Sequence, residues 1–253
     1  MDTKGNTILI TGGGSGIGRG LAEAFHKLGN QVIISGRRKA VLDEVTAANP
    51  GMRSLVLDIE DAAGVKAFAA QVAADFPKLN AVVHNAGIAR MEKLKEQTDV
   101  SDAEAMVATN VLGPIRLNAA LLPHLLKQPK ATVLTVSSGL AFVPLAASPT
   151  YSATKAFLHS YTLSLRHQLQ GTKVQVIELP PPYVQTELGG VQQATDPRAM
   201  PLAAFIAAVM DILTTQPDAT EVVVKECEPL RNATKTDGFD QAFTMVNSLF
   251  DSH

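Results

Sequence analysis

The sequence predicts an α/β fold in which helices cover both faces of one parallel, doubly wound sheet. Short runs rich in Val, Ile and Leu alternate along the chain with stretches of helical periodicity. The runs are apolar at successive positions, as in "QVIIS" and "VQVIEL", which is typical of strands buried on both faces. No linker or repeat divides the 253 residues, of which 46% are hydrophobic, so we expect a single domain over 1–253.

About seven strands are expected, with a helix between most of them. The strands are expected at 7–11, 31–36, 54–59, 81–86, 132–137, 174–179 and 221–225. The helices are expected at about 16–28, 38–48, 61–76, 101–127, 150–170, 201–215 and 239–250. Gly29 stands where a left-handed residue commonly ends a helix, which places the end of the first one.

Charge and cysteine content exclude several classes of function. The 22 basic and 24 acidic residues are mixed along the chain, so neither nucleic acid nor an anionic membrane is expected as a partner. Cys227 is the only cysteine and the six histidines form no metal-binding motif, so we expect neither a disulfide within the chain nor a metal. No secretory signal or membrane-length apolar run is evident, and a soluble cytoplasmic protein is expected.

A glycine-rich turn, "TGGGSGIG", follows the first expected strand and opens the first expected helix. Glycines there let the backbone approach a pyrophosphate, and the helix amino terminus supplies N–H groups with positive partial charge. A dinucleotide coenzyme is therefore predicted, a turn that binds no nucleotide being the alternative. The predicted contacts are Gly12, Gly14, Ser15, Gly16, Ile17 and Gly18.

The end of the second strand, "ISGRRK", favours NADP(H) over NAD(H). Gly36 stands where an NAD site usually has a carboxylate for the ribose 2′-hydroxyl. Arg37 and Arg38 follow it, and their guanidinium groups could bracket a 2′-phosphate. The alternative is that Arg38 and Lys39 merely begin a solvated helix.

Two further strand ends are predicted to meet the coenzyme. Asp58, beside Ile59, could accept a hydrogen bond from the adenine amino group, but aspartate is equally common there as a turn former. The small residues of "NAG", Asn85, Ala86 and Gly87, would let the coenzyme cross the sheet edge, although a simple turn would look similar.

The stretch "PTYSATKAF" predicts a proton-transferring pair. Ser148 and Pro149 form a helix start, so Tyr151 falls in the first turn and Lys155 lies on the same face one turn later. A neighbouring ammonium and a helix amino terminus both favour the phenolate, which suits proton exchange with an alcohol oxygen. The four-residue spacing alone is common by chance.

Two more residues complete this group. Ser138 ends the fifth strand 13 residues before Tyr151, where its hydroxyl could stabilise charge on a substrate oxygen. Ser137 is its rival, because neighbours on a strand point to opposite faces. Asn110 precedes Pro114 by four residues, so its carbonyl lacks a helical partner and could hold a water. The helix should kink near Gly113 and Pro114, and a kink that only shapes packing is the alternative.

Taken together, "TGGGSGIG", "NAG", Asn110, Ser138 and "YSATK" resemble the short-chain dehydrogenase/reductase family over about residues 6–190. The resemblance implies a Rossmann fold with a coenzyme half at about 1–100 and a catalytic and substrate half at about 101–253. It also implies that Tyr151 is the general acid or base, that Lys155 binds the nicotinamide ribose and lowers the tyrosine pKa, that Ser138 orients the substrate and that Asn110 holds a relay water. A homodimer or homotetramer is implied through the helices of Asn110 and Tyr151.

The chain departs from the family pattern in two places. In "PPYVQT", Pro182 replaces a glycine of the family pattern. Pro181, Val184 and Thr186 of the same stretch would meet the nicotinamide end of the coenzyme. In the glycine-rich turn, Ser15 stands where many NADP-dependent relatives have Arg or Lys. Sequence stretches such as "ELPPPYVQTELG" further resemble a subgroup of the family that is named for the D-alanine esterification of teichoic acids.

The substrate side is predicted to be apolar. A lid over about 187–205 is expected beside the cleft, an ordinary surface loop being the alternative. The last helix carries an apolar stripe, Phe239, Phe243, Val246 and Phe250, that could close the pocket, meet another subunit or pack on its own domain. The predicted substrate contacts are Ser138, Leu140, Phe142, Tyr151, Tyr183 and Leu188.

These features predict a carbonyl reductase or alcohol dehydrogenase that acts on a small hydrophobic ketone or secondary alcohol. One alternative is a regulatory protein that binds NADP(H) without turnover, and another is a 3-oxoacyl-thioester reductase. A hydrolase built on Ser138 is disfavoured because no G-x-S-x-G sequence surrounds that serine.

Overall fold

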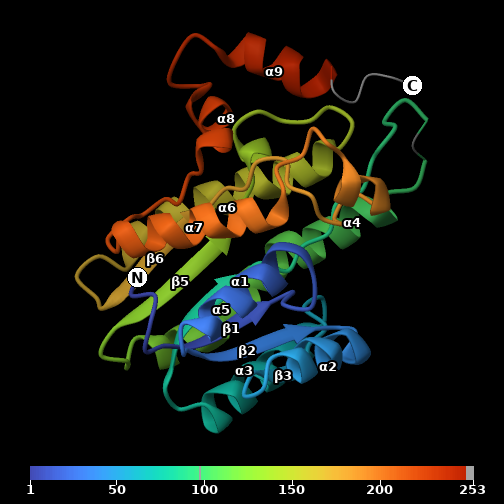
Figure 1. Ribbon diagram of the computed structural model, residues 1–253. Coiled ribbons are helices and arrows are strands. Elements are labelled where there is room, and N and C mark those ends of the chain that lie inside the picture. The colour runs from blue at the N-terminus through green and yellow to red at the C-terminus, as the bar shows by residue number, and fades with distance from the viewer. Residues whose placement is uncertain (97, 249–253) are drawn as a thin grey trace.

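The computed structural model describes residues 1–96 and 98–248, and it confirms a parallel sheet flanked by helices (Figure 1). The described residues form six strands in the order β3-β2-β1-β4-β5-β6. These are β1 (Thr7–Thr11), β2 (Gln31–Gly36), β3 (Arg53–Val56), β4 (Leu79–His84), β5 (Ala131–Val136) and β6 (Val174–Leu179). The strand order reverses between β1 and β4, so a crevice opens at the carboxyl ends of these two strands.

Two apolar layers cover the sheet. The layer on one face contains α1 (Gly16–Lys27), α2 (Lys39–Ala48) and α7 (Leu202–Thr215). The layer on the other face contains α3 (Ala62–Asp75), α5 (Gly113–Leu125) and α6 (Pro149–Gln168). Successive residues of β1 alternate between the layers, since Ile8 and Ile10 belong to the first and Leu9 to the second.

The seventh strand, expected at 221–225, does not form. Glu221 makes a single parallel bridge to Glu178, and Val222 N–H donates to the Glu178 carbonyl at 2.8 Å. The chain then turns into a 3₁₀ helix at Lys225–Cys227, so the ladder ends after that bridge. The expected strand 54–59 is also shorter, because the Asp58 carboxylate accepts from Glu60 N–H and starts a turn.

The long helix expected over 101–127 is interrupted by a π-helical turn. It consists of α4 (Ser101–Val107), the turn at Ala108–Leu112, and α5. Gly113 N–H donates to the carbonyl of Ala108, five residues back. The irregularity lies where a kink was expected, next to Pro114, which has no N–H to continue the ordinary ladder.

Residues 101–125 are long and apolar enough to cross a membrane by composition, with a mean hydropathy of 1.3 over their most apolar window. Half of that window is buried inside the molecule, however. Leu117, Leu121 and Leu125 pack in the layer that contains α3, and α3 is the principal neighbour of α5. This is the arrangement of a core helix of the domain.

The carboxyl-terminal elements lie over one end of the sheet (Figure 1). They are α8 (Glu228–Asn232) and α9 (Phe239–Ser248). Val246 is buried in a small cluster with Val143 and Leu145, whereas Phe239 and Phe243 are stacked on each other and more than one-third exposed. The expected stripe therefore packs partly on its own domain. Its last member, Phe250, lies outside the described residues.

Candidate active site

A cleft of about 1520 Å³ runs along the carboxyl ends of the strands. Its walls include most of the residues that the sequence predicts. Predicted coenzyme contacts in the wall are Gly12, Gly14, Ser15, Gly16, Ile17, Arg37, Arg38, Ile59, Asn85, Ala86, Gly87, Tyr151, Lys155, Pro181, Val184 and Thr186. Predicted substrate contacts in the wall are Ser138, Leu140, Tyr151, Tyr183 and Leu188.

Two glycines of this turn are packed so closely that each excludes a side chain. Gly12 has a φ of +67°, and a Cβ added there would lie 2.9 Å from the Cα of Ala86. A Cβ on Gly18 would lie 2.4 Å from both the Gly12 carbonyl oxygen and Asn85 Nδ2, so Gly18 is the contact between α1 and the turn. Gly18 is not among the described cleft-lining residues, so the structure shows its packing contact, and its contact with the coenzyme stays a prediction.

The residues at this turn fit the pyrophosphate of a dinucleotide. Ser15 flanks the start of α1 without a side-chain hydrogen bond to the first-turn N–H groups, and both Ser15 and Gly16 line the cleft. The segment after β4 is held against this turn because Thr11 Oγ1 accepts from the N–H groups of Asn85 and Ala86 at 3.0 and 3.1 Å. A glycine-rich turn beside a helix amino terminus is suited to an anionic group.

The far end of the cleft has an ion pair that the sequence analysis missed. Arg37 Nη1 lies 3.5 Å from Glu60 Oε1, and the same carboxylate oxygen accepts from Thr109 Oγ1 at 2.6 Å. Asp58, by contrast, is exposed and not among the described residues of the cleft wall, and its carboxylate caps the turn at Glu60. The turn-forming alternative therefore describes Asp58 better than adenine contact does. The one sign of Glu60 in the sequence is its place in the acidic stretch "DIED" after β3.

Ser138, Tyr151 and Lys155 lie together in the cleft wall and are 8%, 7% and 4% exposed. Burial raises the pKa of Tyr151 to about 12, although hydrogen bonding to Ser138 lowers it in part. Burial also lowers the pKa of Lys155 to about 8. The structure therefore does not show the expected depression of the tyrosine pKa, because desolvation of the phenolate outweighs its neighbours. The phenol is neutral at pH 7.

The start of α6 is held by contacts from the segment after β4. Pro149 begins the helix as predicted, and Ser148 Oγ donates to the Arg90 carbonyl at 2.5 Å instead of capping the helix. The Glu92 carboxylate accepts from Thr150 N–H and Thr150 Oγ1, both at 2.9 Å. An acidic side chain at a helix amino terminus is favourable, so Glu92 stabilises the turn that carries Tyr151.

The two serines at the end of β5 have different partners. The Ser137 hydroxyl donates to the buried carboxylate of Glu178 at 2.6 Å. Ser138 Oγ accepts from Leu140 N–H at 3.0 Å, and its interaction with the Tyr151 phenol lowers the pKa of that group in part. This pattern favours Ser138 as the serine that meets a substrate.

Asn110 acts through its side chain in this structure. Its Oδ1 accepts from Ile88 N–H, and its Nδ2 donates to the Ile88 carbonyl, both at 2.9 Å. Nδ2 also donates to Thr154 Oγ1 at 3.1 Å. Asn110 thus ties the loop after β4 to α6, and a water on its main-chain carbonyl stays a prediction.

Comparison with known proteins assigns the family. The model of the short chain dehydrogenases matches residues 6–197. The chain belongs to the short-chain dehydrogenase family. DltE, an uncharacterised oxidoreductase of Bacillus subtilis strain 168, is 38% identical to this chain, and the match covers 98% of this chain and 99% of DltE. This similarity agrees with the subgroup that the sequence stretches indicate.

Two solved short-chain dehydrogenases with bound coenzyme are also similar. A short-chain dehydrogenase from Burkholderia cenocepacia in complex with NADP is 25% identical, with a TM-score of 0.80 over 97% of this chain and 98% of that one. A 3-ketoacyl-(acyl-carrier-protein) reductase from Brucella melitensis complexed with NADH is 27% identical, with a TM-score of 0.79 over 89% and 100%. This chain is thus an NAD(P)-dependent oxidoreductase of the same family.

The substrate side of this short-chain dehydrogenase differs from the prediction at Phe142. That residue is not among the described residues of the cleft wall, and its ring lies between His159 and Arg231, 4.8 Å from the imidazole centroid and 4.7 Å from the guanidinium carbon. The 3₁₀ turn at Gly139–Ala141 carries the chain away before Phe142 can face the cleft. Apolar wall residues that were not predicted as substrate contacts include Leu145, Pro229, Leu230 and Met245.

The segment expected as a lid is ordered by its own hydrogen bonds. Tyr183 OH donates to Asp196 Oδ2 at 3.1 Å, and Gln193 Nε2 donates to the Val184 carbonyl at 2.8 Å. Met200 N–H donates to the Tyr183 carbonyl, which attaches this segment to the chain that follows β6. Whether it opens and closes stays a prediction.

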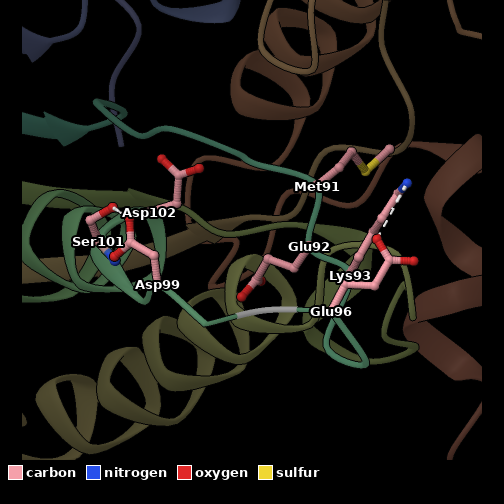
Figure 2. A pocket seen from close by; sticks show the side chains of 7 residues that line it. All are labelled: Met91, Glu92, Lys93, Glu96, Asp99, Ser101 and Asp102. Carbon is pink, nitrogen blue, oxygen red and sulfur yellow. Dashed lines mark hydrogen bonds and ion pairs between the residues drawn. The ribbon is translucent and has the colours of Figure 1, made fainter.

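A second, shallower hollow of about 330 Å³ lies in the segment before α4 (Figure 2). Its side chains are mainly acidic, and Lys93 is paired with Glu96 at 3.9 Å. Among residues 1–96 and 98–248, no group of three or more His, Cys, Asp or Glu side chains is placed to hold a metal ion. The Glu92 carboxylate is bound to Thr150, so this side chain of the hollow supports the start of α6.

Proposed function

We propose that this chain is an NADP(H)-dependent carbonyl reductase that interconverts a ketone and a secondary alcohol. The observation that carries the proposal is the presence of Ser138, Tyr151 and Lys155 in the wall of the cleft that also contains the glycine turn. The nicotinamide coenzyme, when bound, supplies or accepts the hydride. The chain supplies the position of the substrate and the proton.

Each of these residues has a distinct role in the proposal. Tyr151 donates its phenolic proton to the carbonyl oxygen, and its raised pKa keeps that proton available at neutral pH. The Ser138 hydroxyl hydrogen-bonds the same oxygen as negative charge develops on it. Lys155 Nζ lies 5.6 Å from the centroid of the Tyr151 ring, where its positive charge stabilises the phenolate left behind. In alcohol oxidation the phenolate accepts the proton.

The residues of the cleft also support a coenzyme and a substrate class. Arg37 and Arg38 favour NADP(H), because they follow Gly36, which replaces the usual acidic residue, and their guanidinium groups suit a 2′-phosphate. Leu140, Leu145 and Leu230 give the substrate side an apolar wall, which favours a hydrophobic ketone. Cytoplasmic location and a homodimer or homotetramer are proposed by analogy with the family.

The test is to follow the absorbance of NADPH, and then of NADH, with a panel of aliphatic and aromatic ketones and a 3-oxoacyl thioester. Tyr151→Phe is the test variant, and Tyr161→Phe on the same helix is its matched control. We expect NADPH-dependent reduction of free ketones that Tyr151→Phe abolishes and Tyr161→Phe retains. Coenzyme binding without turnover of any panel member would favour the regulatory alternative, and turnover of the thioester alone would favour the acyl-thioester reductase.

A further inference from the structure

A carboxylate is buried behind the proposed catalytic residues. Glu178 on β6 is 0% exposed. Its Oε1 accepts from Ser137 Oγ at 2.6 Å, and its Oε2 lies 2.8 Å from His159 Nδ1. A buried carboxylate is strongly destabilising unless such partners compensate its lost hydration. Both oxygens of Glu178 are compensated, and both partners are next to the active site.

The network spans the strand and the helix that carry the reacting groups. Ser137 immediately precedes Ser138 at the end of β5. His159 follows Lys155 by four residues on α6, so it lies on the helix face of Tyr151 and Lys155. Lys155 Nζ donates to the Val136 carbonyl at 2.9 Å. The end of β5 is therefore attached to α6 twice, directly through Lys155 and indirectly through Glu178.

These attachments bear on the direction of the Ser138 side chain. Neighbouring residues of an extended strand point to opposite faces, and Ser138 keeps an extended backbone with φ −171° and ψ 155°. Drawing the Ser137 hydroxyl toward Glu178 on one face thus presents the Ser138 hydroxyl on the other. An error of about 1 Å in such a group can lower a rate about 100-fold.

We propose that Glu178 is a positioning residue, which holds Ser137 and thereby aims the Ser138 hydroxyl at Tyr151. His159 completes the arrangement by binding the second carboxylate oxygen, and the edge of its ring meets Phe142 with centroids 4.8 Å apart. The kinetic part of this inference rests on the proposed function, whereas its structural part does not.

The first test is a double-mutant cycle on ketone reduction. We expect Ser137→Ala to lower kcat about 10-fold with the KM for NADPH unchanged, and Ser137→Thr, which keeps a hydroxyl, to recover most of the loss. In a Ser138→Ala background, Ser137→Ala should have almost no further effect. Equal effects in both backgrounds would overturn the proposal. Asn30→Ala is the control, because Asn30 is a buried, hydrogen-bonded residue at the opposite ends of the strands.

The second test needs no substrate. The three tyrosines can be labelled with ¹³C at Cζ and assigned by Tyr→Phe variants, so the Tyr151 resonance reports changes in the surroundings of its hydroxyl. Ser137→Ala and Glu178→Leu should shift this resonance in the direction that Ser138→Ala does, while Glu178→Gln, which keeps an acceptor for Ser137, and Asn30→Ala should not. An unshifted resonance in Ser137→Ala contradicts the inference even if Glu178→Leu fails to fold. A shift in a chain that reduces no ketone would retain the inference and reject the proposed function.

Discussion

Lys155 Nζ donates a hydrogen bond to the Val136 carbonyl at 2.9 Å and lies 5.6 Å from the centroid of the Tyr151 ring. Both side chains are buried, so each is shifted toward its neutral form. The phenol consequently keeps its proton well above pH 7, while the ammonium loses its proton near pH 8. This combination suits Tyr151 to act as an acid at neutral pH and makes its support by Lys155 dependent on pH.

The pH profile of ketone reduction should follow Lys155. We expect kcat/KM to fall as pH rises above about 8, because the ammonium that stabilises the phenolate is then lost. Lys155→Arg stays charged at all accessible pH values, so its residual activity should lack this fall. An unchanged fall in Lys155→Arg would assign the titration to another group.

Lys155 should also reduce the stability of the fold. Its pKa is about 8 when folded and 10.5 when unfolded, so below pH 8 the folded state bears the full cost of the buried charge. We expect Lys155→Met to raise the free energy of unfolding at pH 7 by about 1 to 3 kcal/mol. The gain should shrink between pH 8 and 10.5, where only the unfolded lysine is still protonated. Urea unfolding at pH 7 and pH 10.5 measures both values, and a gain that is equal at the two would contradict the assignment.

The Arg37–Glu60 pair should set coenzyme preference. Arg37→Ala should weaken NADP⁺ binding about tenfold and leave NAD⁺ binding nearly unchanged, since only NADP⁺ has a 2′-phosphate. Glu60→Gln should strengthen NADP⁺ binding, because it removes the carboxylate 3.5 Å from the guanidinium. Titration calorimetry with both coenzymes measures the ratio, and parallel losses for the two would reject this role of Arg37.

Asn110 should contribute to the stability of the fold. Its side chain makes three hydrogen bonds in a nearly buried position, so Asn110→Ala should lower the free energy of unfolding by about 2 to 4 kcal/mol. Thr154→Val removes one of these partners and should cost about 1 kcal/mol. Equal unfolding midpoints for wild type and Asn110→Ala would contradict the tie between Ile88 and α6.

The sequence predicted the fold and the shared helix face of Tyr151 and Lys155 because both depend on local patterns. Successive apolar residues identify strands covered on both faces, and a helix start fixes where Tyr151 and Lys155 lie relative to each other. The prediction of a strand at 221–225 was wrong because pairing with β6 beyond Glu221 depends on where the chain turns, and apolar composition does not encode that position.

Contacts between distant segments were the ones that sequence reasoning missed. Glu92 lies 58 residues from Thr150, and Glu178 lies 41 residues from Ser137. One signal was available, since Glu178 is a charged residue inside the apolar run "VQVIEL", where a strand covered on both faces would bury it. The direction of the Phe142 side chain is set by the turn at Gly139–Ala141, and the apolar character of the residue does not predict that turn.

The most direct test of the central claim is to measure deuterium in the alcohol formed from a ketone and NADPH labelled with deuterium at C4 of the nicotinamide. Mass spectrometry of the product reads hydride transfer without relying on coenzyme absorbance. We predict one deuterium at the carbinol carbon with the wild-type chain and with Tyr161→Phe, and no labelled alcohol with Tyr151→Phe. Labelled alcohol formed equally well by Tyr151→Phe would contradict the account.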